Sequence, residues 1–312
     1  MTRALVFPGQ GSQDVGMGKE LYDAFPAAKA VFDEVDDALG EKLSDVIFNG
    51  PEDQLTLTAN TQPALMAVSL AAFAVLTDRG FDLASQAAYV AGHSLGEYSA
   101  LAAAGTFSVG DAAKLLLTRG TAMQAAVPVG EGAMAALLGL DWDTASAVAA
   151  EAAQGDEVCS AANDNVEGQV VISGTKAAVE RAAELAKEKG AKRAIMLPVS
   201  APFHCALMQP AADAMADALA AVTMNAPIIP VIANVTAAPV TDPDEIRKYL
   251  VEQVTGTVRW RESVAKMVEL GVDTMVEVGA GKVLSGMVRR NKAIEGSNVG
   301  GADDIEAFLS SL

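Results

Sequence analysis

The chain has 312 residues, and 51% of them are hydrophobic, so it can bury one large core or two smaller ones. Its formal net charge of −18 argues against non-specific nucleic-acid binding, because a strongly negative protein is repelled by the phosphate backbone. No apolar run approaches the roughly 20 residues that span a bilayer, and the first apolar stretch is too short for a secretory signal, so we expect no membrane association.

In its first part, the sequence alternates between strand-forming and helix-forming segments separated by glycine turns. The expected elements are a strand at 4–7, helices at 19–39 and 64–79, a strand at 87–91 and a helix at 109–126. Pro63 precedes the second helix and suits the first turn of a helix, where a missing backbone N–H costs nothing. This alternation predicts an α/β fold with a largely parallel sheet.

The middle of the chain follows a different order, in which two strands are consecutive. The expected elements are a strand at 133–138, a helix at 141–154, strands at 158–162 and 169–173 around a polar turn at 163–165, a helix at 175–189 and a strand at 193–197. Asp141 is suited to cap the first of these helices. The order β-α-β-β-α-β matches the ferredoxin-like motif. We therefore predict a small ferredoxin-like domain at 129–198, inserted into a larger domain formed by 1–128 and 199–312.

The segment Gly92-His93-Ser94-Leu95-Gly96 fits the pattern G-x-S-x-G. This spacing is typical of a nucleophile elbow, a tight strand-to-helix turn that strains the serine backbone and requires small residues two positions to either side. The serine hydroxyl then projects from the turn, and the following helix directs its positive end towards it. Because the segment lies between a predicted strand and a predicted helix, Ser94 is the candidate nucleophile.

A serine hydroxyl needs a base to become a good nucleophile. The chain has two histidines, and His93 adjoins the serine, where consecutive side chains on a tight turn diverge. His204 is therefore the candidate base, although a hydrogen-bonded structural histidine is the usual alternative. Cys205 is a rival nucleophile, but it has no elbow and is better interpreted as a small buried thiol. Two cysteines form no disulfide framework and fit a reducing cytoplasm.

Other motifs are weaker. The glycine turn at 9–13 is no dinucleotide fingerprint, because Asp14 stands where the third glycine is needed, and its backbone suits donation to an oxyanion better. Arg119 follows an apolar run. It is either a charge at a helix end or a guanidinium that clamps a carboxylate, and the residues leave the two alternatives balanced. We expect no cofactor and no metal.

Five segments occur in an order and at spacings that carry a family resemblance. They are 7–13 (FPGQGSQ), 61–64 (TQPA), 92–98 (GHSLGEY), 169–174 (QVVISG) and 276–279 (VEVG). Together they resemble the malonyl-CoA:acyl-carrier-protein transacylases of bacterial fatty-acid synthesis along almost the whole chain. The resemblance implies an α/β-hydrolase-like large domain with a ferredoxin-like insert.

The resemblance also implies catalytic roles for individual positions. Ser94 matches the serine that carries the acyl group, and His204 matches the catalytic histidine. Arg119 matches the arginine that pairs with the free malonyl carboxylate. Gln253 matches a residue whose backbone carbonyl orients the histidine, so the implied site is a dyad without a carboxylate.

Five further positions correspond to the surroundings of the reacting group. The backbone N–H groups of Gln10 and Leu95 match the oxyanion hole, and Gln62 and Asn163 match polar positions near the pocket. Phe203 occupies a position where a phenylalanine accompanies malonyl rather than methylmalonyl in related domains, because a bulky ring leaves little room for an α-methyl group.

The implied activity is a cytoplasmic, ping-pong transfer of malonyl from malonyl-CoA to the phosphopantetheine thiol of acyl carrier protein, which supplies chain elongation. A serine esterase of the α/β-hydrolase class is one alternative, but the chain lacks an HGGG-like loop and its histidine lies well before the C-terminus. A non-catalytic acyl-binding scaffold is another, against which the presence of Ser94, His204 and Arg119 argues.

Both implied partners are acidic, so association with this acidic chain requires a local basic patch near the entrance to the site. Two clusters qualify: Lys187, Lys189, Lys192 and Arg193, and Arg289, Arg290 and Lys292. The first is the stronger candidate, because it precedes the strand that leads back towards His204. The alternative is that both are ordinary solvated helix ends.

Overall fold

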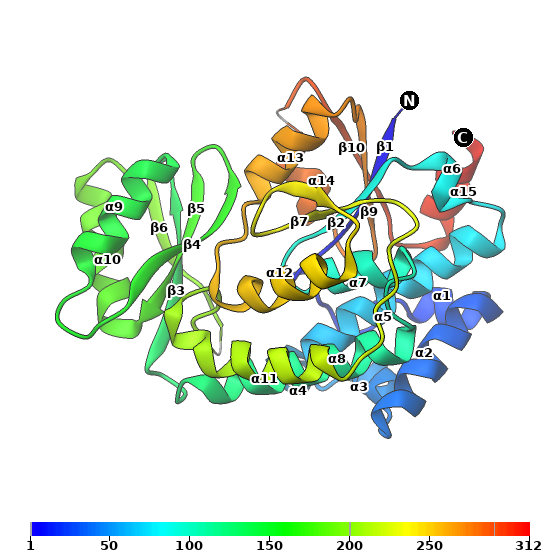
Figure 1. The fold of residues 1–312 in the computed structure, drawn as a ribbon, viewed down its shortest axis with the longest axis horizontal. Helices are drawn as coiled ribbons and strands as arrows, with labels where there is room; N and C mark the ends of the chain where they lie inside the picture. The colour runs from blue at the N-terminus through cyan, green and yellow to red at the C-terminus, as the bar shows by residue number, and fades with distance from the viewer. Residues whose placement is uncertain (1, 200, 290) are drawn as a thin grey trace.

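The computed structural model describes residues 2–199, 201–289 and 291–312, which form an α/β structure built on two sheets (Figure 1). The large sheet has the order β10 (Glu295–Val299), β9 (Thr274–Val278), β1 (Arg3–Phe7), β2 (Tyr89–Gly92), β7 (Val231–Ala233) and β8 (Ala238–Val240). The small sheet has the order β4 (Cys159–Val166), β5 (Gln169–Thr175), β3 (Gly132–Leu138) and β6 (Arg193–Met196). We call the elements around each sheet the large lobe and the small lobe.

The large sheet is parallel from β10 to β7, and its central strand β1 is an apolar run buried on both faces. This confirms the prediction of a largely parallel sheet, with one exception at the edge, where β8 runs antiparallel to β7. Only four residues connect these two strands. A connection this short closes a hairpin, whereas a parallel partner would need a long crossover.

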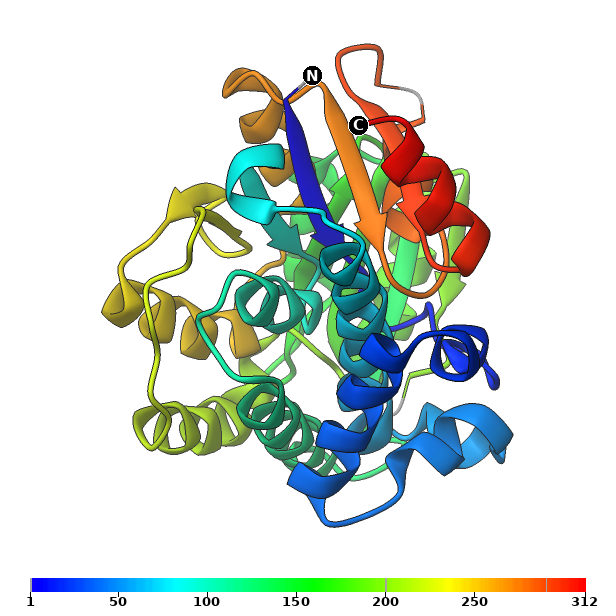
Figure 2. The ribbon, with the colours of Figure 1, turned by 90° about the vertical axis from the view of Figure 1, so that its right-hand side faces the viewer.

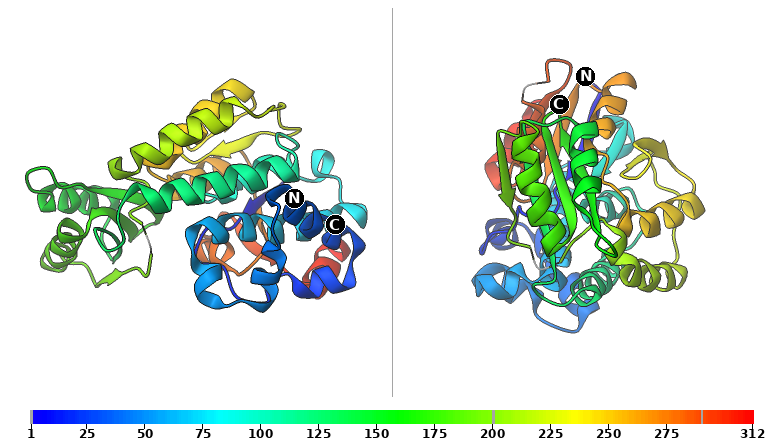
Figure 3. Two further views of the ribbon diagram at one scale, coloured as in Figure 1. Left: turned by 90° about the horizontal axis from the view of Figure 1, so that it is seen from below. Right: turned by 90° about the vertical axis from the view of Figure 1, so that its left-hand side faces the viewer.

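The small sheet is antiparallel throughout, and its elements follow the predicted order. Helices α9 (Trp142–Ala152) and α10 (Lys176–Glu188) cover its outer face (Figure 3, right). Asp141 caps α9 as predicted, because its Oδ1 accepts a hydrogen bond from Thr144 N at 2.8 Å. The predicted polar turn at 163–165 is wrong: these residues lie within β4, which is irregular here and continues to Val166.

Helices of the large lobe surround the large sheet on both sides. They are α1 (Lys19–Ala24), α2 (Pro26–Leu39), α3 (Leu43–Asn49), α4 (Glu52–Thr56), α5 (Thr58–Asp78), α6 (Leu83–Gln86), α7 (Gly96–Ala103), α8 (Val109–Ala126), the 3₁₀ turn η1 (Ala206–Met208), α11 (Gln209–Ala220), α12 (Pro243–Thr255), α13 (Trp260–Glu269), α14 (Val283–Val288) and α15 (Ala302–Ser310). The helix predicted at 19–39 is broken at Phe25, because the residue before a proline disfavours helical backbone.

Helix α5 differs from the prediction at its start and in its length. It begins at Thr58, so Pro63 lies inside the helix rather than in its first turn. Side chains anchor the earlier start, since Thr61 donates to Leu55 O at 2.6 Å and Asn60 donates to Gln54 O at 2.9 Å. With 21 residues, α5 is long and apolar enough to cross a membrane by length and composition, contrary to our expectation. However, 78% of its apolar window is buried, and α5 runs through the middle of the large lobe behind α2 (Figure 2).

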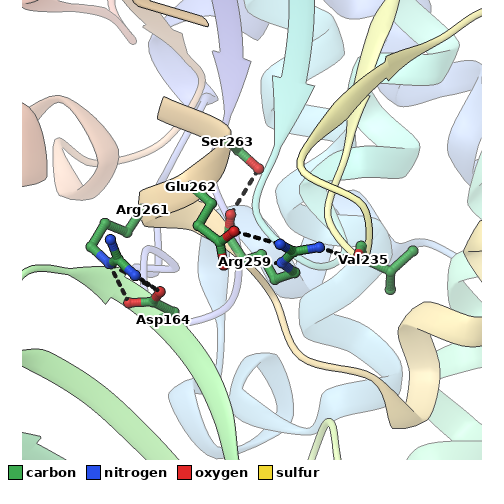
Figure 4. Close-up of polar contacts among 6 residues, drawn as sticks. All are labelled: Asp164, Val235, Arg259, Arg261, Glu262 and Ser263. Atoms are coloured by element: carbon green, nitrogen blue, oxygen red, sulfur yellow. Dashed lines mark hydrogen bonds and ion pairs between the residues drawn. The ribbon is translucent and has the colours of Figure 1, made fainter. Parts of the chain in front are cut away.

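A polar contact joins β4 of the small lobe to α13 of the large lobe (Figure 4). Arg261 Nε donates to both carboxylate oxygens of Asp164 at 3.0 Å, and a terminal nitrogen lies 2.8 Å from Oδ2. The Asp164 side chain is only 2% exposed. The backbone extends this contact, because Asp164 N donates to Val258 O at 3.0 Å and Val258 N donates to Ala162 O at 2.9 Å.

Replacing Arg261 with methionine should destabilise the protein by about 1–3 kcal/mol, because it leaves the buried Asp164 carboxylate without its charged partner. Urea unfolding of the two proteins measures this difference. Lys248→Met is the matched control, since Lys248 pairs with Glu252 on the exposed side of α12 and should contribute at most about 0.5 kcal/mol. Equal stabilities for wild type and Arg261→Met would show that the contact between the lobes carries no net stability.

Candidate active site

Ser94 lies on a tight turn between β2 and α7, as the sequence pattern predicts. Its φ is 54°, in the left-handed region that non-glycine residues rarely adopt. Both flanking glycines are required by close backbone approaches. A Cβ on Gly92 would lie 1.9 Å from Gly96 O, and one on Gly96 would lie 2.2 Å from Phe7 O. The turn therefore holds the serine at the carboxyl end of the central strands, with α7 starting immediately after it.

His204 lies beside Ser94, although 110 residues separate them in the chain. Its Nε2 is 2.8 Å from Ser94 Oγ, and its Nδ1 is 2.8 Å from the backbone carbonyl of Gln253. Because a carbonyl only accepts hydrogen bonds, Nδ1 carries the proton and Nε2 is free to accept the serine proton. Burial, followed by the positive charge of Arg119, lowers the pKa of His204 to about 3. The imidazole is therefore neutral at physiological pH, as a general base must be.

Arg119 lies within α8 and is 1% exposed, so it is not a charge at a helix end. Its guanidinium donates to Gln62 Oε1 at 2.8 Å, to Gln253 Oε1 at 2.9 Å and to Ser94 Oγ at 3.1 Å. Among the described residues, it thus binds amide and hydroxyl oxygens rather than a carboxylate. Burial lowers its pKa, since the charged form has lost its water. A buried cation of this kind favours an anionic ligand beside the serine.

A cavity of about 340 Å³ opens at this turn, between the two lobes. Its walls include all but one of the site residues predicted from the sequence: Gln10, Gln62, Ser94, Leu95, Arg119, Asn163, Phe203 and His204. Gln253 lies behind the wall, fully buried, where it contacts both His204 and Arg119. Leu95 directly precedes α7, and N–H groups at the start of a helix have no partner within it.

Two further residues hold the turn from outside and were missed by the sequence reasoning. Asn234, which follows β7, accepts a hydrogen bond from Ser94 N at 2.8 Å and donates to Gly92 O at 2.7 Å. Glu97 accepts from Asn234 N at 3.1 Å. Asn234 has no sequence signal of its own, because it lies 140 positions from the serine it supports. Glu97 lies within the segment 92–98, but its spacing alone does not show that it contacts Asn234.

The two remaining candidates bond to other residues. His93 lines the same cavity, but its Nε2 is 2.8 Å from Asn165 Oδ1 in the small lobe. Cys205 is 1% exposed and donates to Pro202 O at 3.2 Å. Burial raises the pKa of the Cys205 thiol, which disfavours the reactive thiolate. The structure thus confirms the interpretation of Cys205 as a small buried thiol.

The chain is similar along its length to known acyltransferases. Residues 4–299 match the acyl transferase domain family. The malonyl CoA-acyl carrier protein transacylase of Bacillus subtilis is 47% identical over 310 residues, covering 99% of this chain and 96% of that protein. The corresponding protein of Escherichia coli K12 is 49% identical over 287 residues, covering 92% of each.

Solved structures give the same result. The acyl-carrier-protein S-malonyltransferase of Bartonella henselae is 58% identical, with a TM-score of 0.97, and the match covers 100% of this chain and 99% of that one. A malonyl-transacylase solved in complex with its type II PKS acyl-carrier protein is 42% identical, with a TM-score of 0.96 over 100% of both chains.

The low pKa of His204 predicts an unusual pH dependence for the reactivity of Ser94. Because burial lowers this pKa from 6.5 to about 3, the imidazole remains a neutral base as the pH falls. The rate at which an uncharged fluorophosphonate labels Ser94 should therefore show no decline centred near 6.5 between about pH 8 and pH 5. Ser94→Ala controls for labelling elsewhere. A decline with a midpoint near 6.5 would mean that an ordinary, solvated histidine is the base.

Proposed function

The chain belongs to the acyl transferase domain family, and on this premise we propose that it transfers a malonyl group from malonyl-CoA to the phosphopantetheine thiol of acyl carrier protein. One observation carries the proposal beyond the family: a buried guanidinium, on Arg119, lies 3.1 Å from the hydroxyl of a serine paired with a neutral histidine. That arrangement suits an acyl group that ends in a carboxylate.

Acylation begins when His204 Nε2 accepts the proton of Ser94 as the hydroxyl oxygen attacks the thioester carbonyl. The C–O bond forms and the carbonyl oxygen becomes an oxyanion, which the backbone N–H groups of Gln10 and Leu95 stabilise. The C–S bond then breaks, and CoA leaves with the proton that His204 returns. The malonyl group remains as an ester on Ser94.

Transfer repeats these steps in the opposite direction. The phosphopantetheine thiol gives its proton to His204, its sulfur attacks the ester, and Ser94 recovers the proton as the new thioester leaves. In this ping-pong cycle the Gln253 carbonyl, 2.8 Å from Nδ1, orients the imidazole in place of the carboxylate of a triad. The product supplies malonyl units for fatty-acid elongation.

Selectivity rests on Arg119 and Phe203. An acyl chain without a carboxylate leaves the buried guanidinium without an anionic partner, which penalises acetyl-CoA relative to malonyl-CoA. Phe203 lines the cavity next to His204, and its ring restricts space for an α-methyl group. Gln62 and Asn163 supply polar groups to the same walls.

We propose the finer fold labels on the same basis. The elbow after β2 supports an α/β-hydrolase-like large domain at 1–128 and 199–312. The antiparallel order β4-β5-β3-β6, with two helices on one face, supports a ferredoxin-like insert at 129–198. The bacterial enzymes to which the chain is similar support a location in the cytoplasm.

The basic cluster of the small lobe is our candidate for carrier-protein docking. Lys187 and Lys189 form ion pairs with Glu184 and Glu151. Lys192 and Arg193 are exposed at the start of β6, so they are the better candidates for contact with an acidic partner. In the second cluster, Arg290 lies outside the described residues.

The covalent intermediate gives the direct test of this function. Incubation with malonyl-CoA should add one malonyl group to the wild-type protein by intact-mass spectrometry, and none to Ser94→Ala. His204→Ala should slow acylation by about 10²–10⁴-fold, the usual loss when a general base is removed. Adding carrier protein should discharge the adduct faster than water does. Equal discharge with and without carrier protein would instead support an esterase, and no adduct at all would support an acyl-binding scaffold.

Arg119→Ala should change the preference of the enzyme rather than abolish its chemistry. Losing a charge-assisted pair costs about 1.5–3 kcal/mol, so malonyl transfer should fall by at least about tenfold while acetyl transfer falls less or rises. The measurement is kcat/KM for each acyl-CoA. Equal losses for both substrates would assign Arg119 a structural role only.

A further inference from the structure

Glu97 is a buried carboxyl group next to the reaction centre that the mechanism above does not use. It lies in the first turn of α7, three residues after Ser94, and is 2% exposed. It does not line the cavity. Its Oε2 accepts two hydrogen bonds, from Gln253 Nε2 at 2.7 Å and from Asn234 N at 3.1 Å. Glu97 can therefore act on bound substrate only through its neighbours.

The Gln253 side chain connects Glu97 to the guanidinium. Its Oε1 accepts from Arg119 at 2.9 Å, and its Nε2 donates to Ser94 O at 3.0 Å and to Glu97 Oε2. Rotating this amide by half a turn would bring its N–H groups against the donors of Arg119 and its oxygen against two acceptors. The acceptors Ser94 O and Glu97 Oε2 thus select one of the two orientations.

We propose, on the premise of the malonyl transfer described above, that Glu97 is a positioning residue. It fixes the orientation of the Gln253 amide and, through it, of Arg119. Its charge adjusts the preference for malonyl over acetyl groups. Two effects follow from this one residue. Its oxygen orients the amide whether the carboxyl is charged or neutral. Its negative charge, when present, offsets the positive charge that binds the malonyl carboxylate.

The charge effect depends on the groups that face Glu97. These are Arg119 on α8, Gln253 on α12, Asn234 after β7 and Tyr98 on its own helix. Burial raises the pKa of Glu97 to about 7, although the hydrogen bonds from Gln253 and Asn234 and the charge of Arg119 lower it. At a pH below this pKa the Glu97 carboxyl is neutral, so it does not offset the positive charge of Arg119. The preference for malonyl should therefore be strongest at low pH and weaken as the pH rises through about 7.

Two substitutions separate the effects. In Glu97→Gln the amide oxygen can still accept from Gln253 and Asn234, but the charge is gone; Glu97→Met removes both the acceptor and the charge. The readout is the ratio of kcat/KM for malonyl-CoA to that for acetyl-CoA between about pH 6 and pH 8.5. The ratio cancels the titration of the CoA phosphates, which both substrates share.

For the wild type, the ratio should fall by roughly threefold or more as the pH rises. For Glu97→Gln it should be independent of pH and close to the low-pH value of the wild type. For Glu97→Met it should fall by at least about tenfold at every pH, because Arg119 loses its orientation. Asp36→Asn is the matched control: Asp36 is a buried carboxyl bonded to Ser44, and its replacement should leave the ratio unchanged.

Two results would overturn the proposal: the same pH slope in Glu97→Gln as in the wild type, or equal losses for both substrates in a folded Glu97→Met variant. If thermal unfolding shows that Glu97→Met does not fold, the pH dependence of the kcat/KM ratio in Glu97→Gln alone decides whether the proposal holds. Failure of the proposed function would give a different result, because the wild type would then gain no malonyl adduct.

Discussion

The geometry of the site depends on Gln253, which contacts the nucleophile, the base and the buried cation at once. Its backbone carbonyl faces His204, its side-chain oxygen faces Arg119, and its amide nitrogen reaches Ser94 O. No other described residue forms hydrogen bonds with all three. A displacement of α12 would therefore disturb the proton acceptor and the anion-binding group together.

The electrostatics of the site contrast with those of the whole chain. A protein with a formal net charge of −18 surrounds its reaction centre with one buried cation, a neutral histidine and several amides. The Arg119 charge also helps to keep His204 neutral, since each disfavours a second positive charge nearby. The guanidinium therefore has two consequences: it favours an anionic acyl group, and it maintains the base in its proton-accepting form.

The sequence predicts those parts of the site that local spacing determines. The elbow is a five-residue pattern, and His204 follows from the scarcity of histidine. The neighbouring residues leave Arg119 ambiguous, because whether an arginine lies at a helix end or inside depends on tertiary packing, and only the family resemblance implies its role. Asn234 and Glu97 were missed, since their partners come from distant strands and helices. Similarly, the sequence does not reveal that β8 runs antiparallel to β7, because two short strands joined by four residues show little hydrophobic periodicity.

The irregular strand β4 has a further consequence for how substrates reach the site. Three consecutive residues face three different partners: Asn163 lines the cavity, Asp164 binds Arg261, and Asn165 contacts His93. A rigid rotation of the small lobe would break the Asp164 and Asn165 contacts together. A long, flexible thiol arm is thus better admitted by movement of the side chains that line the cavity than by a hinge. Met123, Met134 and Met287 are among these side chains, and unbranched thioethers change rotamer at low cost, so the cavity walls can deform while the backbone stays fixed.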